Sequence, residues 1–262
     1  MTSKNTLIIG TRGSALALAQ ADMVRAALSA LHPGLDIRRE IIRTTGDRRT
    51  DVPLADVARV SGIVDKGIFI KELETALLEG RIDVAVHSLK DVPSELAPEF
   101  RLPAVLPRAA AEDVLITKEP DWNGRGTLAT GSVRRRLMAR TYWGRQLRFE
   151  DLRGNVPTRL EKLVEHPEWD AVILAKAGLE RLGLYAPETV VQGRKLYMRP
   201  LPVEAFIPAV GQGIVGMECR ASDRKTKELL AGINDAETCA CGMAERTFLV
   251  LSLIHISEPT RH

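Results

Sequence analysis

The chain has 262 residues, of which 45% are hydrophobic and 27% are charged, and 37 Lys and Arg against 34 Asp and Glu give a formal charge of +3. These values are typical of a globular protein and exclude a disordered chain, a collagen and a coiled coil. No apolar run approaches the ~20 residues that a membrane helix needs, and the N-terminus shows no secretory signal. Three cysteines are too few for a disulfide framework, so we expect a cytoplasmic protein with no membrane partner.

Short apolar runs alternate with amphipathic stretches along the first hundred residues. In chain order, the periodicity predicts a strand over 7–10, a helix over 15–31, a strand over 37–42, a helix over 69–79 and a strand over 82–86. His32, Pro33 and Gly34 end the first helix, and Gly80 stands where the end of a helix favours glycine. A polar loop over 87–93 follows the third strand.

The same alternation returns in the second half of the chain. It predicts strands over 114–117, 127–130, 147–150 and 171–174, and helices over 133–142, 157–165 and 177–182. Strands that alternate with helices favour an α/β fold with largely parallel sheets. Because the elements form two groups, we expect two lobes with a join near 102–111, which contains Pro103 and Pro107. Residues 253–262 continue no periodicity, and we expect them to be a non-native tail.

The first candidate site is the stretch 10–14, with the sequence GTRGS, between a predicted strand and a predicted helix. Free N–H groups at the start of a helix attract anions, and Arg12 adds a full positive charge. The alternative is a tight turn in which Ser14 caps the helix. The stretch lacks the third glycine of a dinucleotide-binding motif, and the chain contains no Gly-Lys-Ser or Gly-Lys-Thr phosphate loop.

The second candidate site is the stretch 87–91, with the sequence HSLKD, which follows a predicted buried strand. Ligands of α/β proteins bind at the C-terminal ends of strands. Lys90 would hold an acidic group there and Asp91 a cationic centre, and the alternative is a solvated pair of loop charges. We expect His87 to be packed in the core rather than to act as a catalyst.

Arginine is concentrated in one segment of the chain. Between residues 125 and 159, nine arginines face only two acidic residues and no lysine, which gives this window a charge of +7. The nine are Arg125, Arg134, Arg135, Arg136, Arg140, Arg145, Arg148, Arg153 and Arg159. Arginine is favoured where carboxylates or phosphates are bound through two hydrogen bonds. We therefore expect a polyanionic partner: a small polycarboxylate, a phosphate or a nucleic acid.

Other features narrow these alternatives. Aromatic residues make up only 4% of the chain, so platforms for stacked bases are scarce and we do not expect nucleic acid as a partner. A solvated helix face would explain Arg140 and Arg145. The three cysteines, Cys219, Cys239 and Cys241, have neither a second pair nor a nearby His, so we expect no metal site.

Taken together, six stretches of the chain resemble the porphobilinogen deaminase family, also called hydroxymethylbilane synthase. They are 11–20 (TRGSALALAQ), 66–74 (KGIFIKELE), 85–93 (AVHSLKDVP), 130–135 (TGSVRR), 152–160 (LRGNVPTRL) and 208–213 (PAVGQG). The resemblance covers roughly residues 6–249, and the six motifs stand in the family's order.

The resemblance implies a three-domain α/β fold in which two lobes, like those of periplasmic binding proteins, enclose a central cleft. By analogy, the first lobe comprises residues 1–105 and 199–221, and the second comprises residues 106–198 with an arginine-rich cleft face. A small α+β third domain is represented by its start, residues 222–250. Residues 251–262 would be the non-native tail.

The resemblance also implies a transferase of tetrapyrrole and heme biosynthesis. Four molecules of porphobilinogen are deaminated and joined head to tail into hydroxymethylbilane, on a dipyrromethane cofactor that a cysteine holds through a thioether. Each pyrrole carries an acetate and a propionate, which suits an arginine-rich site. We expect a cytoplasmic monomer.

The family's functional residues are carried over by position. Asp91 would be catalytic and would stabilise the cation that remains when ammonia departs. The cofactor-binding residues would be Lys90, Asp91, Ser132, Arg134 and Arg135. The substrate-binding residues would be Arg12, Ser14, Gln20, Arg153, Arg159 and Arg181. Lys66 matches a lysine of a mobile loop near the active site.

The chain departs from the family after residue 249. The family continues into a Glu-Gly-Gly-Cys motif whose cysteine carries the cofactor, and the corresponding position here is Ile256. Cys239 and Cys241 do not match that anchor. We therefore interpret the chain as a C-terminally truncated deaminase joined to an unrelated tail, and we expect it to be inactive. The alternative is a non-catalytic two-lobe module that binds anions.

Overall fold

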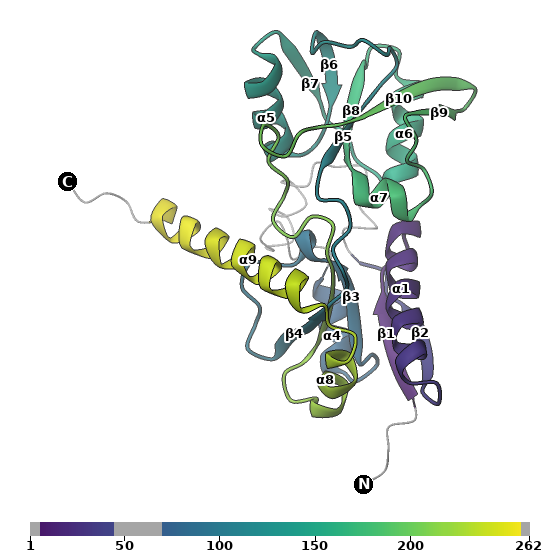
Figure 1. Ribbon diagram of the computed structural model, residues 1–262, viewed down its shortest axis with the longest axis vertical. Helices are drawn as coiled ribbons and strands as arrows, with labels where there is room; N and C mark the ends of the chain where they lie inside the picture. The colour runs from purple at the N-terminus through teal and green to yellow at the C-terminus, as the bar shows by residue number, and fades with distance from the viewer. Residues whose placement is uncertain (1–5, 45–69, 258–262) are drawn as a thin grey trace, which may run out of the picture.

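The strands of the protein form two separate sheets, each in a lobe of its own (Figure 1). The computed structural model describes residues 6–44 and 70–257. The first lobe contains a five-stranded sheet and the second a six-stranded sheet, and helices cover both. The fold is therefore mixed α/β with two lobes, as the sequence predicts.

The sheet of the first lobe has the strand order β2-β1-β3-β11-β4. Its strands are β1 (Thr6–Thr11), β2 (Asp36–Ile41), β3 (Val84–Ser88), β4 (Phe100–Val105) and β11 (Val215–Arg220). Its helices are α1 (Ala15–Leu31), α4 (Lys71–Leu78) and α8 (Arg224–Ala231), and a short 3-10 turn, η2 (Leu89–Asp91), follows β3. Val84 and Val86 of β3 pack in one core cluster with α1 and α8, whereas Ala85 packs in another with α4. Because side chains alternate along a strand, β3 is buried on both faces.

The sheet of the second lobe has the strand order β7-β6-β8-β5-β10-β9. Its strands are β5 (Asp113–Thr117), β6 (Gly126–Ala129), β7 (Leu147–Glu150), β8 (Ala171–Ala175), β9 (Glu188–Val191) and β10 (Arg194–Pro200). Its helices are α5 (Val133–Trp143), α6 (Val156–Glu165) and α7 (Lys176–Arg181). Val114 of β5 packs in one core cluster with α6 and α7, and Leu115 packs in another with α5. Helices therefore lie on both faces of this sheet as well.

A long helix, α9 (Ala236–Ser257), follows α8 and projects outward from the first lobe (Figure 1). It extends into the segment 253–262, which we expected to be a non-native tail. In the described part of the chain, no helix is both long enough and apolar enough to cross a membrane. The division of the chain into domains stays a prediction, although β11 lies in the first sheet and all of β5–β10 in the second.

The expectation of largely parallel sheets is wrong. The parallel pairings are those of β1 with β2 and β3, and of β6 with β7 and β8. In contrast, β11 is antiparallel to β3 and β4, and β5 is antiparallel to β8 and β10. An alternating sequence reveals local strand–helix–strand units, which give parallel pairs. It does not reveal β11, which joins the first sheet after the chain returns from the second lobe. It also does not reveal the pairing of β5, which joins the second sheet as the chain arrives from the first lobe.

The boundaries of single elements mostly agree with the periodicity, and α1 matches its predicted range. Two differences lie near the site. Strand β3 includes His87 and Ser88, which we expected in a loop. Strand β4 occupies part of the expected join and contains Pro103. Proline is tolerated there because β4 lies at the edge of its sheet and pairs with β11 alone.

Candidate functional site

The site lies at the junction of the lobes, where the C-terminal ends of parallel strands in one sheet face those in the other. Most of the predicted site residues lie in the segments that follow β1, β3, β6 and β7. Helix α1, which follows β1, packs against α7, which follows β8, and Leu16 lies beside Gly178. The C-terminal ends of the parallel strands therefore meet at the junction of the lobes, which is where α/β proteins bind ligands.

The first lobe contributes a small polar cavity of about 70 Å³. Its lining includes Arg12, Ser14, Gln20, His87 and Asp91. Ser14 caps α1, because its Oγ accepts a hydrogen bond from the N–H of Ala17 at 3.3 Å. Gln20 is buried, and its Nε2 donates to Oγ of Ser88 at 2.8 Å. The structure thus brings four predicted site residues together around one cavity, and it confirms the cap at Ser14.

His87 is a core residue, as the sequence predicts. It is 5% exposed, and its Nε2 lies 2.8 Å from Oε2 of Glu218, which is 0% exposed. Glu218 lies on β11, the strand next to β3. The pair therefore joins two neighbouring strands beneath the loop that carries Lys90 and Asp91.

Lys90 reaches from the first lobe toward the second. Its Nζ donates to Oε1 of Gln212 at 3.4 Å. Burial of the ammonium and, after it, the positive charge of Arg135 lower the pKa of Lys90 to about 8, although Asp91 and Asp113 act in the opposite direction. Because burial and nearby positive charges disfavour the protonated ammonium, an anion bound beside Lys90 would stabilise it.

In the second lobe, Arg134 and Arg135 begin α5 and share one carboxylate. Arg134 Nη2 donates to Oδ2 of Asp113 at 2.6 Å, and Arg135 Nη2 donates to Oδ1 at 2.8 Å. Ser132 caps α5, and its Oγ accepts from the N–H of Arg135 at 3.3 Å. The Nε of Arg135 is buried and has no hydrogen-bond partner within the described ranges.

The other predicted arginines lie in the second lobe around the same junction. Arg159 donates from Nε to the carbonyl of Gly154 at 2.7 Å. Burial and, after it, the positive charge of Arg135 lower the pKa of Arg159 to about 10, although Asp91 acts in the opposite direction. Arg181 crosses to the segment before β11, where its Nη2 donates to the carbonyl of Gly213 at 2.7 Å. Its Nε is buried without a hydrogen-bond partner in the part of the chain that the structure describes.

The remaining predicted residues differ in their relation to this cluster. Arg140 and Arg145 are both exposed, but only Arg140 lies on a helix face as expected, because α5 ends at Trp143. Arg153 is half-buried near Arg159 and lowers its pKa. Lys66 lies outside the described residues.

Two residues of the cluster were not predicted, Asp113 and Gln212. Asp113 is 0% exposed and Gln212 is 1% exposed. The partners of Asp113 lie 21 and 22 positions away in the sequence, on another element, so no local pattern marks them. Gln212 stands in one of the family's motifs, and that was the available signal.

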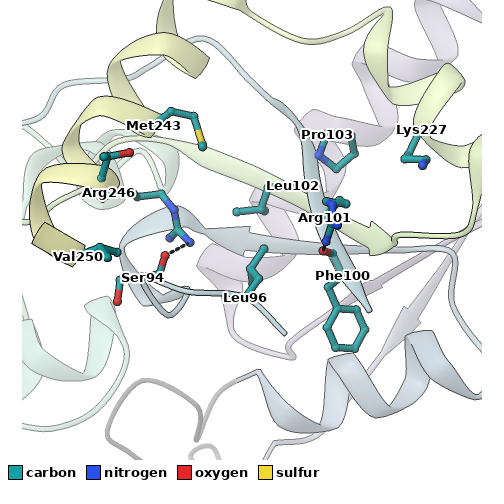
Figure 2. A pocket seen from close by; sticks show the side chains of 11 residues that line it. Ser94, Leu96, Phe100, Arg101, Leu102, Pro103, Lys227, Met243, Arg246 and Val250 are labelled. Carbon is teal, nitrogen blue, oxygen red and sulfur yellow. Dashed lines mark hydrogen bonds between the residues drawn. The ribbon is translucent and has the colours of Figure 1, made fainter. Parts of the chain in front are cut away.

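A larger cavity, of about 550 Å³, lies away from this cluster (Figure 2). Its lining comes from β4, the preceding loop, α8 and α9, and includes none of the predicted site residues. Arg246 of α9 reaches the loop there and donates to the carbonyl of Ser94 at 2.9 Å (Figure 2). The chemistry predicted from the sequence therefore belongs to the small cavity and the lobe junction.

The cysteines and acidic residues offer little for a metal. Among the residues that the structure describes, no three His, Cys, Asp or Glu side chains are grouped to hold a metal ion. All three cysteines are free thiols, and burial raises the pKa of Cys219 to about 11. Cys239 is half-buried and Cys241 is exposed.

The fold and the site together define a two-lobed α/β protein with a basic, partly buried cluster of side chains at the junction of its lobes. The family model described as "Porphobilinogen deaminase, dipyromethane cofactor binding domain" matches residues 7–228. The chain therefore belongs to the porphobilinogen deaminase family.

Two individual relatives agree with this assignment. The porphobilinogen deaminase of Syntrophotalea carbinolica is 44% identical over 94% of this chain and 74% of its own length. That of Acidithiobacillus ferrooxidans is 42% identical over 93% of this chain and 75% of its own length. Among solved structures, the periplasmic VFT2 domain of Bordetella pertussis BvgS is 14% identical, with a TM-score of 0.49 over 92% of this chain and 93% of that one.

Proposed function

We propose that the lobe junction binds the carboxylates of porphobilinogen and of the pyrrole chain made from it, in the deaminase reaction of tetrapyrrole synthesis. The observation that carries this proposal is the group of Lys90, Arg135 and Arg159, of which Arg135 is buried and the other two are half-buried, and whose charges act on one another across the two lobes. Only Asp91 and Asp113 oppose them in that group. A substrate with two carboxylates on each ring supplies the missing negative charge.

The residues of the junction fit a dipyrromethane group. The buried Nε atoms of Arg135 and Arg181 are donors that have no partner within the described ranges, and carboxylate oxygens would satisfy them. When bound, this group supplies the pyrrole carbon to which the first substrate is joined. Its acidic side chains would be held by Lys90, Ser132, Arg134 and Arg135.

Arg12, Ser14, Gln20, Arg153, Arg159 and Arg181 would hold the carboxylates of the substrate and the growing chain. Asp91 lies between the cavity and the arginines, since it lines the former and acts on the charge of Arg159. In the reaction, the carbon–nitrogen bond of porphobilinogen breaks and ammonia leaves. The methylene carbon then bonds to the free carbon of the acceptor pyrrole, which loses a proton. A fixed carboxylate at Asp91 would stabilise the positive charge that develops on the substrate ring.

We further propose that the 262-residue sequence by itself does not complete this reaction. Its Ile256 stands where the family's anchoring cysteine is expected, and a thioether cannot form on that side chain. Cys219 is buried with a raised pKa and is a poor nucleophile. In this form the chain would act as a two-lobe module that binds anions, in the cytoplasm and as a monomer.

Calorimetry with porphobilinogen tests the binding site. Arg159→Gln should weaken binding by ~10-fold or more, because a charge-assisted hydrogen bond contributes ~1.5–3 kcal/mol. Arg145→Gln is the matched control, since Arg145 is exposed and lies outside the cluster. Equal affinities of the two variants would refute the assignment of Arg159.

A further inference from the structure

Asp113 accepts hydrogen bonds from three side chains of the site, yet the family motifs assign it no role. It is the first residue of β5 and is 0% exposed. Its Oδ2 accepts from Arg134 at 2.6 Å, and its Oδ1 accepts from Arg135 at 2.8 Å and from Gln212 at 3.1 Å. One buried carboxylate thus holds two guanidinium groups and an amide.

The pairing fixes both arginines at two points each. Arg134 also donates to the carbonyl of Ile207, and Arg135 also donates to the carbonyl of Ile173 at 2.8 Å. Burial by itself favours the neutral acid, but the charges and hydrogen bonds of Arg135 and Arg134 outweigh it and lower the pKa of Asp113. The carboxylate therefore stays ionised at neutral pH. It sets the direction in which the free Nε of Arg135 points.

Gln212 extends this arrangement to the other lobe. Its Nε2 donates to the carbonyl of Ala111 at 2.7 Å and to Asp113, so its Oε1 is the atom left to accept from Lys90. An unbroken path of hydrogen bonds therefore runs from the guanidinium groups of α5 through Asp113 and Gln212 to the ammonium of Lys90. The side-chain amide of Gln212 can make these contacts in one orientation only, because an amide NH₂ group cannot accept a hydrogen bond from an ammonium.

We propose that Asp113 is a positioning residue of the anion site, which holds Arg134 and Arg135 and, through Gln212, aligns Lys90 of the opposite lobe with them. The proposal rests on the proposed function for the identity of the anion, but its geometry does not depend on that identity. If the carboxylate only stabilised α5 against β5, removing its charge would not weaken the binding of an anion.

The titration of Lys90 tests whether the charge of Asp113 acts on the ammonium of the opposite lobe. The charged groups that act on its ammonium are Arg135, Arg159, Asp91 and Asp113, and Asp113 is one of the two that favour the protonated form. Asp113→Asn preserves the size of the side chain and removes its charge. The variant should therefore lower the pKa of Lys90 below its value of about 8.

Competitive acetylation of the unliganded 262-residue chain, followed by peptide mass spectrometry, measures this pKa as the pH at which Lys90 is half reactive. Asp151→Asn is the matched control, because Asp151 pairs with Arg136 of the same helix but is exposed. We expect a downward shift in Asp113→Asn and none in Asp151→Asn. An unshifted midpoint in Asp113→Asn would overturn the proposal.

Binding of porphobilinogen gives a second readout. Asp113→Asn makes the site more positive, so charge alone would tighten the binding of an anion. Loss of positioning should instead weaken it by roughly 10-fold at pH 7, the effect of one misplaced charge-assisted hydrogen bond. Unchanged or tighter binding would contradict the proposal. If the parent chain does not bind porphobilinogen, the proposed function fails, while the Lys90 titration still tests whether Asp113 acts on the ammonium of Lys90.

A double-mutant cycle keeps the test decisive if Asp113→Asn folds poorly. Arg135→Met removes one of the two guanidinium groups that the carboxylate neutralises. Asp113→Asn should then lower the melting temperature less in the Arg135→Met background than in the parent chain, because the shared ion pair is already lost. Equal losses in both backgrounds would show that Asp113 does not act through Arg135, and would overturn the proposal.

Discussion

At the scale of single residues, Lys90 lies in a loop of the first lobe and responds to the charge of Arg135 in the second lobe. Its position after β3 was readable from the sequence, because a buried strand followed by Lys-Asp marks a binding edge. Its partner Gln212 lies 122 positions away, and Asp113 makes its ion pairs across 21 and 22 positions. Side chains that meet through tertiary structure leave no periodic signal, so this half of the cluster could not be predicted.

The ionisation of Lys90 predicts how the affinity for porphobilinogen depends on pH. Only the protonated ammonium attracts a carboxylate, and burial and Arg135 lower the pKa of Lys90 in the free protein to about 8. Affinity should therefore be full below pH 7 and should fall as the pH rises through 8 to 9. Because a bound carboxylate favours the charged form, binding near pH 8 should also take up protons.

Calorimetry between pH 6.5 and 9.5, in buffers of different ionisation enthalpy, measures both effects. Lys90→Gln should bind more weakly and lose the fall near pH 8. The same pH dependence in Lys90→Gln would assign the titration to another group.

At the scale of elements, the strands and helices of the two alternating groups were predictable, including the antiparallel strand β5, whereas β4, β9, β10, β11, α8 and α9 were not. Helix α1 has a cap at Ser14 and ends before His32, so the local sequence determines both ends of the helix. Strands β9, β10 and β11 carry no such signals, and β11 is so fully buried that its sequence shows no alternation. The two segments that join the lobes, 106–112 and 201–214, depend on contacts between them, which include the N–H of Ala109 donating to the carbonyl of Gly213 at 3.1 Å.

Gly213 is the residue of these joining segments that least tolerates a side chain. Its φ is +89°, and a Cβ would lie 2.4 Å from the carbonyl oxygen of Ala109. Gly193 has a similar φ of +78°, but no heavy atom would lie within 4 Å of its Cβ. Gly193→Ala should thus cost only the ~1–2 kcal/mol of the left-handed conformation. Gly213→Ala should cost at least about twice as much, because the backbone of the other segment must also move.

Chemical denaturation of the two variants beside the parent chain measures these costs. The difference between the variants isolates the contact between the joining segments, since both share the strain of positive φ. Equal losses of stability would show that the two segments yield without cost.

At the scale of the whole molecule, α9 contacts both the loop that carries Lys90 and the segment that carries Gln212. Oε2 of Glu245 accepts from the N–H of Gly211 at 2.7 Å, beside Gln212, and Glu245 also pairs with Arg108. The next residue, Arg246, donates to the carbonyl of Pro93 at 2.6 Å, just after Lys90 and Asp91. One turn of α9 therefore fixes both the loop of the first lobe and the segment that returns from the second. The sequence predicted two lobes and a basic site between them, but not this support.

The most direct test of catalysis at this junction is product formation by a chain in which residues 251–262 are replaced by a family-like continuation that includes Glu-Gly-Gly-Cys. That chain, supplied with porphobilinogen, should form hydroxymethylbilane, and the 262-residue chain should not. Asp91→Ala in the extended chain should reduce turnover by ~10²–10³-fold, the usual effect of removing one preorganised electrostatic group. Absence of product from the extended chain, or near-normal turnover of its Asp91→Ala variant, would contradict the assignment of the reaction to these residues.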